Sequence, residues 1–298
     1  MTYVADSIDT LPRMPSWVTS GRAETLEDVA FLSGAALSHL HLVLNQDDVP
    51  QTLLRQRLAL RAAEACAAHQ GRPERARELR DAVAFLQPGD SPGPAGEVYL
   101  SWRRAVERPI SVKALHRALP ELAPDQIAVW LDGYDPCGAR QRSPISRTAA
   151  VLQLVLEERP RDHRAGLLLA EAALAQALGW SHVLPLLALG LKRADLRKTG
   201  VELRLACHRA IAVGACAATR EIGELVRRAA RLKTVAPRLR AKGADEAVAL
   251  FLSRDAVAPG HLIPLRSDRA ARRFCDRLVE LRAVRELTDR DTFRLYGI

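Results

Sequence analysis

The chain has 298 residues, of which 48% are hydrophobic and only 4% aromatic, and its formal net charge is +9. The core must therefore be built mostly from alanine, leucine and valine, and because alanine and leucine are strong helix formers we expect an all-α fold. The length allows two domains or one large helical domain. The most apolar stretch, residues 183–191, contains Pro185 and is too short to cross a bilayer, which excludes a transmembrane helix there.

The first half of the chain predicts an irregular arm followed by a helical domain. Residues 1–23, with two prolines and a glycine, form the expected arm, and residues 24–143 the N-terminal helical domain. Thr25 and Asp28 make an approximate capping box for the first helix, which should run to about residue 44. The small residues 33–36 at its centre predict close approach of another helix, so this helix should be central to the N-terminal bundle. Further helices are expected at residues 51–69, 73–86, 97–106, 112–119 and 125–131, with a Gly- and Pro-rich loop at 87–96.

The second half predicts another run of helices and a separate tail. Residues 133–143 break the helical pattern and mark a soft boundary, after which residues 144–243 form a second helical segment packed on the first. Residues 256–265 have the prolines and glycine of a linker. The helices expected here cover residues 145–158, 163–178, 183–192, 201–216, 221–233 and 245–252.

The last residues have the pattern of a helix followed by a β-hairpin. Ser267 is suited to cap the helix, and two short strands, residues 284–287 and 293–296, flank a polar turn. Together with the helix at 245–252, they predict a winged helix-turn-helix-like module over residues 244–298. The spacing between these two helices is loose, so a middle helix is missing or is supplied by residues 232–242. The apolar positions of the tail helix recur at helical spacing, at Ala271, Phe274, Leu278 and Leu281.

Such a tail favours binding to double-stranded DNA. A helix fits the major groove, where guanidinium groups bind guanine edges, and a hairpin contacts the DNA backbone. The acidic residues in the tail would repel phosphate, and the hairpin lacks the usual turn glycine, so docking on the body of the chain or on a protein partner is the alternative. The residues expected to contact DNA are Arg269, Arg272, Arg273 and Arg277 of the helix, Arg290 and Arg294 of the hairpin, and Arg238, Arg240 and Lys242 before the module.

The distribution of charge agrees with this interpretation. Residues 221–298 contain 17 Lys and Arg and 11 Asp and Glu, a net charge of +6, which leaves +3 of the total +9 for residues 1–220. A basic run without acidic residues begins at Arg227 and ends at Lys242. Such a run is either a solvated face of the protein or a contact for phosphate.

We find no pattern that predicts an enzyme, a cofactor or a metal site. His39 and His41 diverge on a helix, and Cys66 with His69 makes only half of a zinc site. The loop at 87–96 lacks the Gly-Lys-Ser/Thr end of a nucleotide-binding loop. An enzyme with an unrecognised active site stays a minor alternative. Reduced, buried thiols and a cytoplasmic location are expected from five cysteines without a CxxC pair, at positions Cys66, Cys137, Cys207, Cys216 and Cys275.

Several stretches together resemble a known family. They are residues 30–37 (AFLSGAAL), 57–63 (RLALRAA), 79–82 (LRDA), 88–96 (PGDSPGPAG), 236–244 (APRLRAKGA) and the tail from Ser267. Their order resembles an alphaproteobacterial, often plasmid-borne family of unknown function with a helical body and a winged helix-like tail. The body distantly resembles Fic-type proteins, but the H-P-F-x-x-G-N motif is absent, so AMP transfer is not implied. The resemblance implies that the chain ends in a winged helix-like tail. It implies no activity, substrate or catalytic residue.

Overall fold

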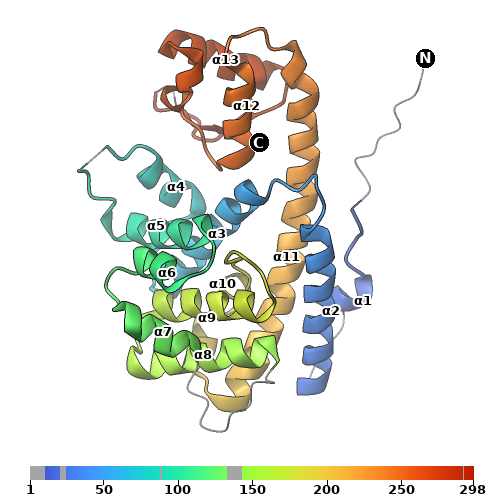
Figure 1. Cartoon of the computed structure of the whole chain (residues 1–298), viewed down its shortest axis with the longest axis vertical. Coiled ribbons are helices and arrows are strands. Elements are labelled where there is room, and N and C mark those ends of the chain that lie inside the picture. Colours follow the sequence, from blue (N-terminus) through green and yellow to red (C-terminus); the bar gives the residue numbers. More distant parts are fainter. Residues whose placement is uncertain (1–10, 21–24, 88, 133–142, 291) are drawn as a thin grey trace.

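One long helix, α11 (Gly200–Val235), runs through most of the molecule, and the other elements pack along it (Figure 1). The computed structural model describes residues 11–20, 25–87, 89–132, 143–290 and 292–298. Helices dominate these residues, which confirms the expected, mainly all-α architecture. No helix among them is both long and apolar enough to cross a membrane.

The body of the molecule consists of helices packed around one apolar core. α2 lies along α11, and the buried apolar side chains form a continuous cluster that includes both predicted helical segments, 24–143 and 144–243. The soft boundary between them lies almost wholly outside the described residues. The body helices are α1 (Ser16–Ser20), α2 (Leu26–Leu44), α3 (Gln51–His69), α4 (Ala76–Ala84), α5 (Gly93–Glu107), α6 (Val112–Ala118), α7 (Pro124–Asp132), α8 (Pro144–Glu158), α9 (His163–Ala177) and α10 (Leu187–Gly190).

Several predicted helix boundaries are confirmed, and two helix starts are not. The capping box of α2 is present, because the Asp28 amide donates to the Thr25 hydroxyl at 3.1 Å and the Thr25 amide donates to the Asp28 carboxylate at 3.3 Å. α4 begins at Ala76 and not at Pro73, since the Glu78 carboxylate caps the amide of Arg75 at 2.7 Å. α5 begins inside the predicted loop, with a proline in its first turn, where the missing amide costs nothing.

The helices predicted at 201–216 and 221–233 are a single helix, α11. The residues between them, Ala217 to Arg220, continue the helix. Gly214, one turn earlier in α11, is required by packing. A Cβ atom at Gly214 would lie 2.1 Å from the carbonyl oxygen of Leu186, and one at Gly190 would lie 2.3 Å from that of Ala210. The glycines therefore allow residues 186–190 to lie directly against α11.

The prediction of a continuous helix over residues 183–192 is wrong. Its centre forms the short helix α10. Pro185 prevents a continuous helix, and a 3-10 turn, η2 (Arg193–Arg197), follows. The amides of Leu186 and Ala188 donate instead to the carboxyl of Glu171, at 2.7 and 3.0 Å. Glu171 is fully buried, and burial raises the pKa of its carboxyl to about 8, so this group is protonated near neutral pH.

The small centre of α2 packs against α11, as expected. Ser33 and Ala36 are fully buried, and the Ser33 hydroxyl lies 2.7 Å from Nδ1 of His208 on α11. Gly34 does not take part in this contact, because a Cβ atom there would meet nothing within 4 Å, and it lines an open groove between α2, α8 and α11. α2 is therefore held to α11 through its small residues and a buried Ser–His hydrogen bond.

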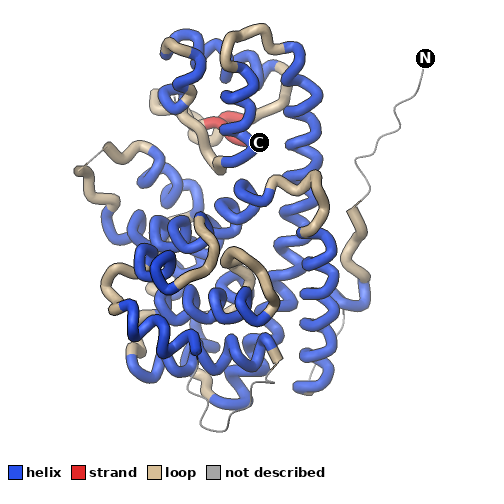
Figure 2. The backbone as a smooth tube through the Cα atoms, viewed as in Figure 1, coloured by secondary structure: helices blue, strands red, loops and turns tan. Residues whose placement is uncertain are grey.

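The chain after α11 folds into a C-terminal module, residues 239–298, at one end of the molecule (Figure 2). Tyr296 is paired on both sides, with Glu286 in the antiparallel sheet and with Val257, which exchanges two backbone hydrogen bonds with it at 2.8 and 2.9 Å. The predicted linker therefore contributes to the sheet. After the 3-10 turn η3 (Ala236–Arg238), the elements are α12 (Ala244–Ser253), η4 (Pro259–His261), η5 (Ile263–Leu265), α13 (Asp268–Glu280), β1 (Arg285–Glu286) and β2 (Tyr296–Gly297).

Candidate nucleic-acid interface

α13 forms where the sequence predicts it, and its phase is as expected. The Ser267 side chain accepts the amide of Ala270 at 3.2 Å, so it caps the helix start. Ala271, Phe274 and Leu278 are buried, while Leu281 is half-buried beyond the helix end. The opposite face is consequently exposed, on the side of the module that points away from the body (Figure 1).

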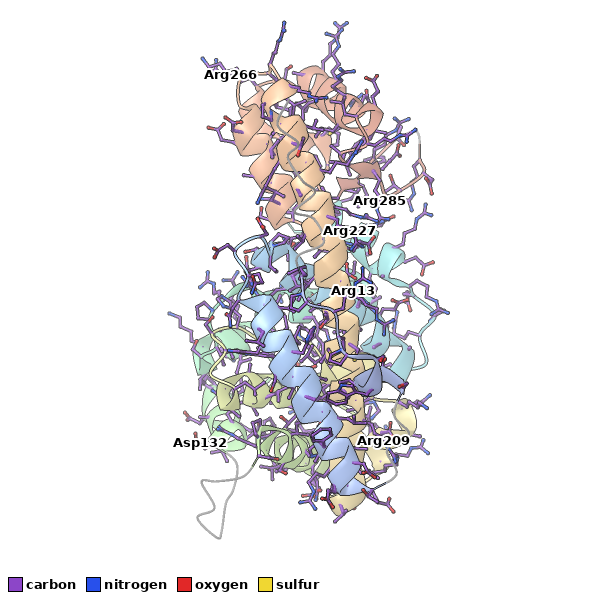
Figure 3. All side chains as sticks on the ribbon, turned by 90° about the vertical axis from the view of Figure 1, so that its right-hand side faces the viewer. Arg13, Asp132, Arg209, Arg227, Arg266 and Arg285 are labelled. Carbon is purple, nitrogen blue, oxygen red and sulfur yellow. The ribbon has the colours of Figure 1, made fainter. Side chains whose placement is uncertain are left out.

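The first half of this exposed face is basic. Arg269, Arg272 and Arg273 are all exposed. Arg272 pairs with Asp268 at 2.7 Å, whereas Arg269 and Arg273 make no ion pair within the described part of the chain. Arg266, in the loop before α13, lies at the same end of the molecule (Figure 3).

The second half of α13 is of mixed charge. Arg277, the fourth helical arginine predicted to contact DNA, pairs with Glu280 at 2.8 Å, and Asp276 is exposed beside them. The positive charge of the helix is therefore concentrated in its first two turns, the part that reaches base edges in helix-turn-helix proteins.

The hairpin faces the opposite way, toward the body. Its turn is held by two arginines of α4. Arg80 donates to the carbonyl oxygen of Leu287 at 2.9 Å, and Arg77 donates to that of Thr288. Arg77 also lies 3.6 Å from the carboxylate of Asp289.

The two hairpin arginines predicted to contact DNA are paired with carboxylates. Arg290 lies 3.3 Å from the buried carboxylate of Asp81 on α4, and Arg294 lies 3.7 Å from Glu286 of its own hairpin. Phe293 meets Phe85 edge to face, with ring centroids 5.5 Å apart. The structure therefore places Arg290 in a joint between the module and the body, whereas Arg294 is held within the hairpin.

The basic run before the module divides into two groups. Arg228 pairs with Glu224, Lys233 lies 4.0 Å from Asp48, and Arg231 donates to the carbonyl oxygens of residues 281 and 282 at 2.9 and 2.8 Å. Arg231 thereby caps the end of α13. The three predicted contact residues Arg238, Arg240 and Lys242 are exposed, and none of them makes an ion pair within the described ranges.

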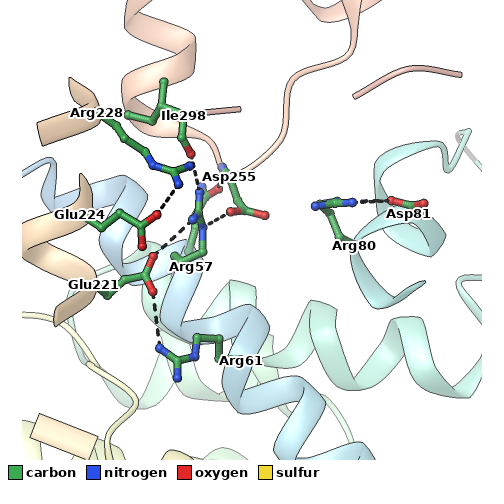
Figure 4. A network of polar contacts seen from close by, with 10 residues as sticks. Arg57, Arg61, Arg80, Asp81, Glu221, Glu224, Arg228, Asp255 and Ile298 are labelled. Atoms are coloured by element: carbon green, nitrogen blue, oxygen red, sulfur yellow. Dashed lines mark hydrogen bonds and ion pairs between the residues drawn. The ribbon is translucent and has the colours of Figure 1, made fainter. Parts of the chain in front are cut away.

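A buried ion-pair network joins the module to the body (Figure 4). At its centre, Arg57 of α3 bonds the carboxylate of Asp255, lies 3.3 Å from Glu221 of α11, and donates to the backbone oxygen of Ile298 at 3.1 Å. The Arg57 and Asp255 side chains are only 13% and 5% exposed. Burial opposes the charge of Arg57, but Asp255 and Glu221 outweigh it and raise the pKa of the guanidinium. Arg57 therefore stays charged at neutral pH, and its contacts fix the module on α3 and α11.

Comparison with known proteins gives a family. The family described as "Protein of unknown function (DUF1403)" matches residues 3–298. The chain belongs to this family. No curated protein sequence matches it.

The Cys66–His69 pair considered from the sequence has other contacts in the structure. The Cys66 thiol accepts the Trp102 indole N–H at 3.3 Å, and burial raises the pKa of this thiol to about 12. His69 bonds the carbonyl oxygen of Leu191 at 3.0 Å. Cys66 therefore behaves as a core residue and not as a zinc ligand, and four of the five cysteines are buried free thiols, with Cys137 outside the described residues.

Sequence reasoning missed the residues that form the joint. Arg57, Arg77 and Arg80 lie in helices that are ordinary in composition, and their partners lie about 160 to 240 positions away in the chain, a separation that no local pattern records. One signal was Asp81, which lies at a buried position of α4. A buried carboxylate needs positively charged partners, so arginines were to be expected near it.

Proposed function

We propose that the C-terminal module binds double-stranded DNA, with α13 in the major groove. The observation that carries this proposal is the pair Arg269 and Arg273. Both are exposed, neither is in an ion pair within the described residues, and both lie in the first turns of a helix that faces away from the body. Guanidinium groups in this position can bond guanine edges or phosphates.

The order of elements supports a winged helix-turn-helix relationship. A helix (α12), one bridged residue (Val257), two 3-10 turns (η4 and η5), a second long helix (α13) and a hairpin follow one another. The two turns occupy the place of the middle helix that the sequence left unassigned. At its two predicted contact residues the hairpin departs from the usual role of a wing, because Arg290 and Arg294 are paired within the chain. We therefore assign Arg290 to anchoring on α4 and Arg294 to holding the hairpin, and neither of them to phosphate contact.

Arg238, Arg240 and Lys242 fit a second set of contacts in this proposal. They are exposed and close in sequence to the module, and they suit the phosphate backbone beside the groove, since phosphate affinity needs only clustered cations. The proposal describes a binding protein without enzymatic activity, acting where DNA is present in the cytoplasm of a bacterial cell.

A protein partner on the same face is the second candidate. Ile263, in η5 before α13, is 81% exposed, and Val279 on α13 is 37% exposed. Exposed aliphatic side chains beside arginines suit the apolar anchor and rim of a protein interface. An acidic partner would then compete with DNA for α13.

The test uses the full chain, because a fragment starting at residue 221 would cut α11 and remove Arg57. Binding to random-sequence duplexes is measured by fluorescence anisotropy between 50 and 200 mM salt, values of the order over which such affinities change strongly. We expect the logarithm of the binding constant to fall linearly with that of the salt concentration. The double variant Arg269→Ala/Arg273→Ala should bind more weakly, with a slope smaller by about two units.

The matched control is Arg108→Ala/Lys113→Ala, which removes the same charge from exposed positions on the body. It should leave the affinity within about twofold of wild type, because charges beyond a Debye length are screened. If the wild-type chain shows no salt-dependent binding, or if the control loses as much affinity as the α13 variant, the DNA proposal is wrong.

A further inference from the structure

A second concave site lies at the opposite end of α11 from the C-terminal module. A groove of about 650 Å³ is formed by the end of α3, the last turns of α8 with the connection to α9, and the η2 turn with the start of α11 that follows it. These three stretches are far apart in the sequence. All of the residues that line the groove belong to the described part of the chain.

The groove is strongly basic. Arg161, Arg193, Arg197 and Lys198 contribute four positive charges to its wall, and Glu157 contributes one negative charge. Asp195, beside the groove, holds Lys198 at 2.6 Å. Arg161, Arg193 and Arg197 make no ion pair among the described residues, so the wall has uncompensated positive charge.

The start of α11 adds to this potential. Its N-cap residue, Thr199, lines the groove but makes no side-chain capping bond. The amide of Gly200 donates to the side-chain carbonyl of Gln153 at 2.8 Å. The start of a helix of 36 residues is a preferred place for an anion, because amide groups and the helix dipole both favour negative charge.

A buried histidine provides independent evidence for a ligand. His69 is only 6% exposed and lines the groove. Its Nε2 bonds the carbonyl oxygen of Leu191 at 3.0 Å, so Nε2 carries a proton, and its Nδ1 is buried without a partner in the described structure. Nδ1 of His163, on the same wall, is also buried without one. In this tautomer of His69, Nδ1 is an acceptor, so it gains a bond from an oxyanion when the imidazole takes up a proton or when the ligand brings an O–H group, as hydrogen phosphate does.

We propose that this groove binds a small dianion of the phosphate type, held by Arg193, Arg197 and the start of α11, with His69 and His163 at its inner wall. Planar guanidinium groups bind tetrahedral oxyanions through paired hydrogen bonds, which favours phosphate over a simple halide. The ligand is either inorganic phosphate or a small molecule with a phosphate group. The site is independent of DNA binding by α13.

The first test is calorimetric titration of the full chain with sodium phosphate. We expect saturable binding to one site, weakened about tenfold or more by Arg193→Ala and by Arg197→Ala, since each removes charge-assisted hydrogen bonds. Both residues are exposed, so the variants should fold. The control is Lys192→Ala, an exposed cation outside the groove, which should bind like wild type. No saturable binding by wild type, or equal binding by the two arginine variants, would overturn the proposal.

A second measurement distinguishes inorganic phosphate from an organic phosphate as the ligand of the groove. Glycerol phosphate and a ribose phosphate are titrated beside inorganic phosphate. Tighter binding of either organic phosphate assigns a metabolite, and equal or weaker binding assigns the inorganic ion. If a DNA duplex displaces phosphate from the groove while Arg269→Ala/Arg273→Ala leaves DNA affinity unchanged, the groove is a DNA contact and the small-ligand proposal is wrong.

The histidines predict the pH dependence. Burial, together with the neighbouring Arg193, lowers the pKa of both His69 and His163, and a bound dianion would raise both values again. Asp195 opposes this effect at His69, and Asp162 opposes it at His163, where Arg197 adds to the effect of Arg193. Glu157, Arg161 and Lys198 line the same groove. Sulfate, whose charge is constant in this range, should therefore bind more tightly as the pH falls below about 6.5, the ordinary pKa of histidine. His163→Gln should reduce this dependence, and a pH-independent sulfate affinity in wild type would contradict the placement of the histidines.

Discussion

Arginines lie on both faces of the C-terminal module, but those on the two faces differ in whether they have a partner within the described chain. On the outer face of α13, Arg269 and Arg273 have no carboxylate partner in the described structure. On the hairpin, Arg290 is held by the buried Asp81, and the turn carbonyls are held by arginines of α4. Arginine content alone therefore does not identify a nucleic-acid surface. The presence or absence of an internal partner separates the two faces.

The largest expected effect comes from removing the core that both faces share. Phe274 is 5% exposed, and Phe274→Ala should destabilise the module by about 3–5 kcal/mol. Hydrogen exchange followed by mass spectrometry should show that residues 268–298 lose protection while α9 keeps its own. Unchanged protection of the module would show that Phe274 is not part of its core.

The next effect concerns the joint on the hairpin side. Arg57→Ala leaves Asp255 and Glu221 buried without their main partner, and we expect a loss of about 3 kcal/mol in unfolding free energy. Arg61→Ala is the control, because Arg61 also pairs with Glu221 but is 40% exposed, and its loss should cost at most about 1 kcal/mol. Urea unfolding measures both. Equal losses in the two variants would show that burial of the Arg57 network does not set its contribution.

A smaller effect should follow from separating the hairpin from α4. Arg290→Ala removes one of the two cations beside Asp81 and leaves Arg80, so we expect a loss of about 1 kcal/mol. Exchange protection of residues 286–290 should fall while that of α13 is kept. If α13 loses protection to the same degree, the two faces are not mechanically separate.

The smallest effect is expected at the rim of the joint. Asp289 is 84% exposed and lies 3.6 Å from Arg77, so Asp289→Ala should change the unfolding free energy by no more than about 0.5 kcal/mol. The Arg77 bond to the Thr288 carbonyl remains in this variant. A change above about 1 kcal/mol in urea unfolding would mean that this exposed pair contributes more than its geometry suggests.

Local patterns in the sequence predicted much of the fold. The bounds of α3, the capping box of α2 and the buried stripe of α13 all follow from spacing and capping. The errors have tertiary causes. The amides of Leu186 and Ala188 are held by the buried Glu171, so the segment around them does not follow its local helical propensity. Gly214 in α11 is required by packing against Leu186, which the local pattern does not record.

The sequence predicted one candidate site, the outer arginines of α13, but not the role of Arg290 or the basic groove. The outer arginines of α13 follow from the helix phase, because positions opposite a buried stripe are exposed. The role of Arg290 did not follow, since its partner Asp81 is more than two hundred positions away. The basic groove was also missed, because its lining comes from three separate stretches and becomes a cluster only when α3, α8 and the η2–α11 stretch meet.

The most direct measurement of the central claim is a selection of bound sequences from random duplexes, made with the full-length wild type, Arg273→Ala and Arg290→Ala. A bidentate arginine–guanine pair is worth roughly 1–3 kcal/mol of discrimination, so Arg273→Ala should lose the preference at one base position. Arg290→Ala should keep the wild-type motif, because its side chain is bound to Asp81. If Arg290→Ala alters the motif while Arg273→Ala leaves it intact, α13 is not the element that contacts the bases and the hairpin is.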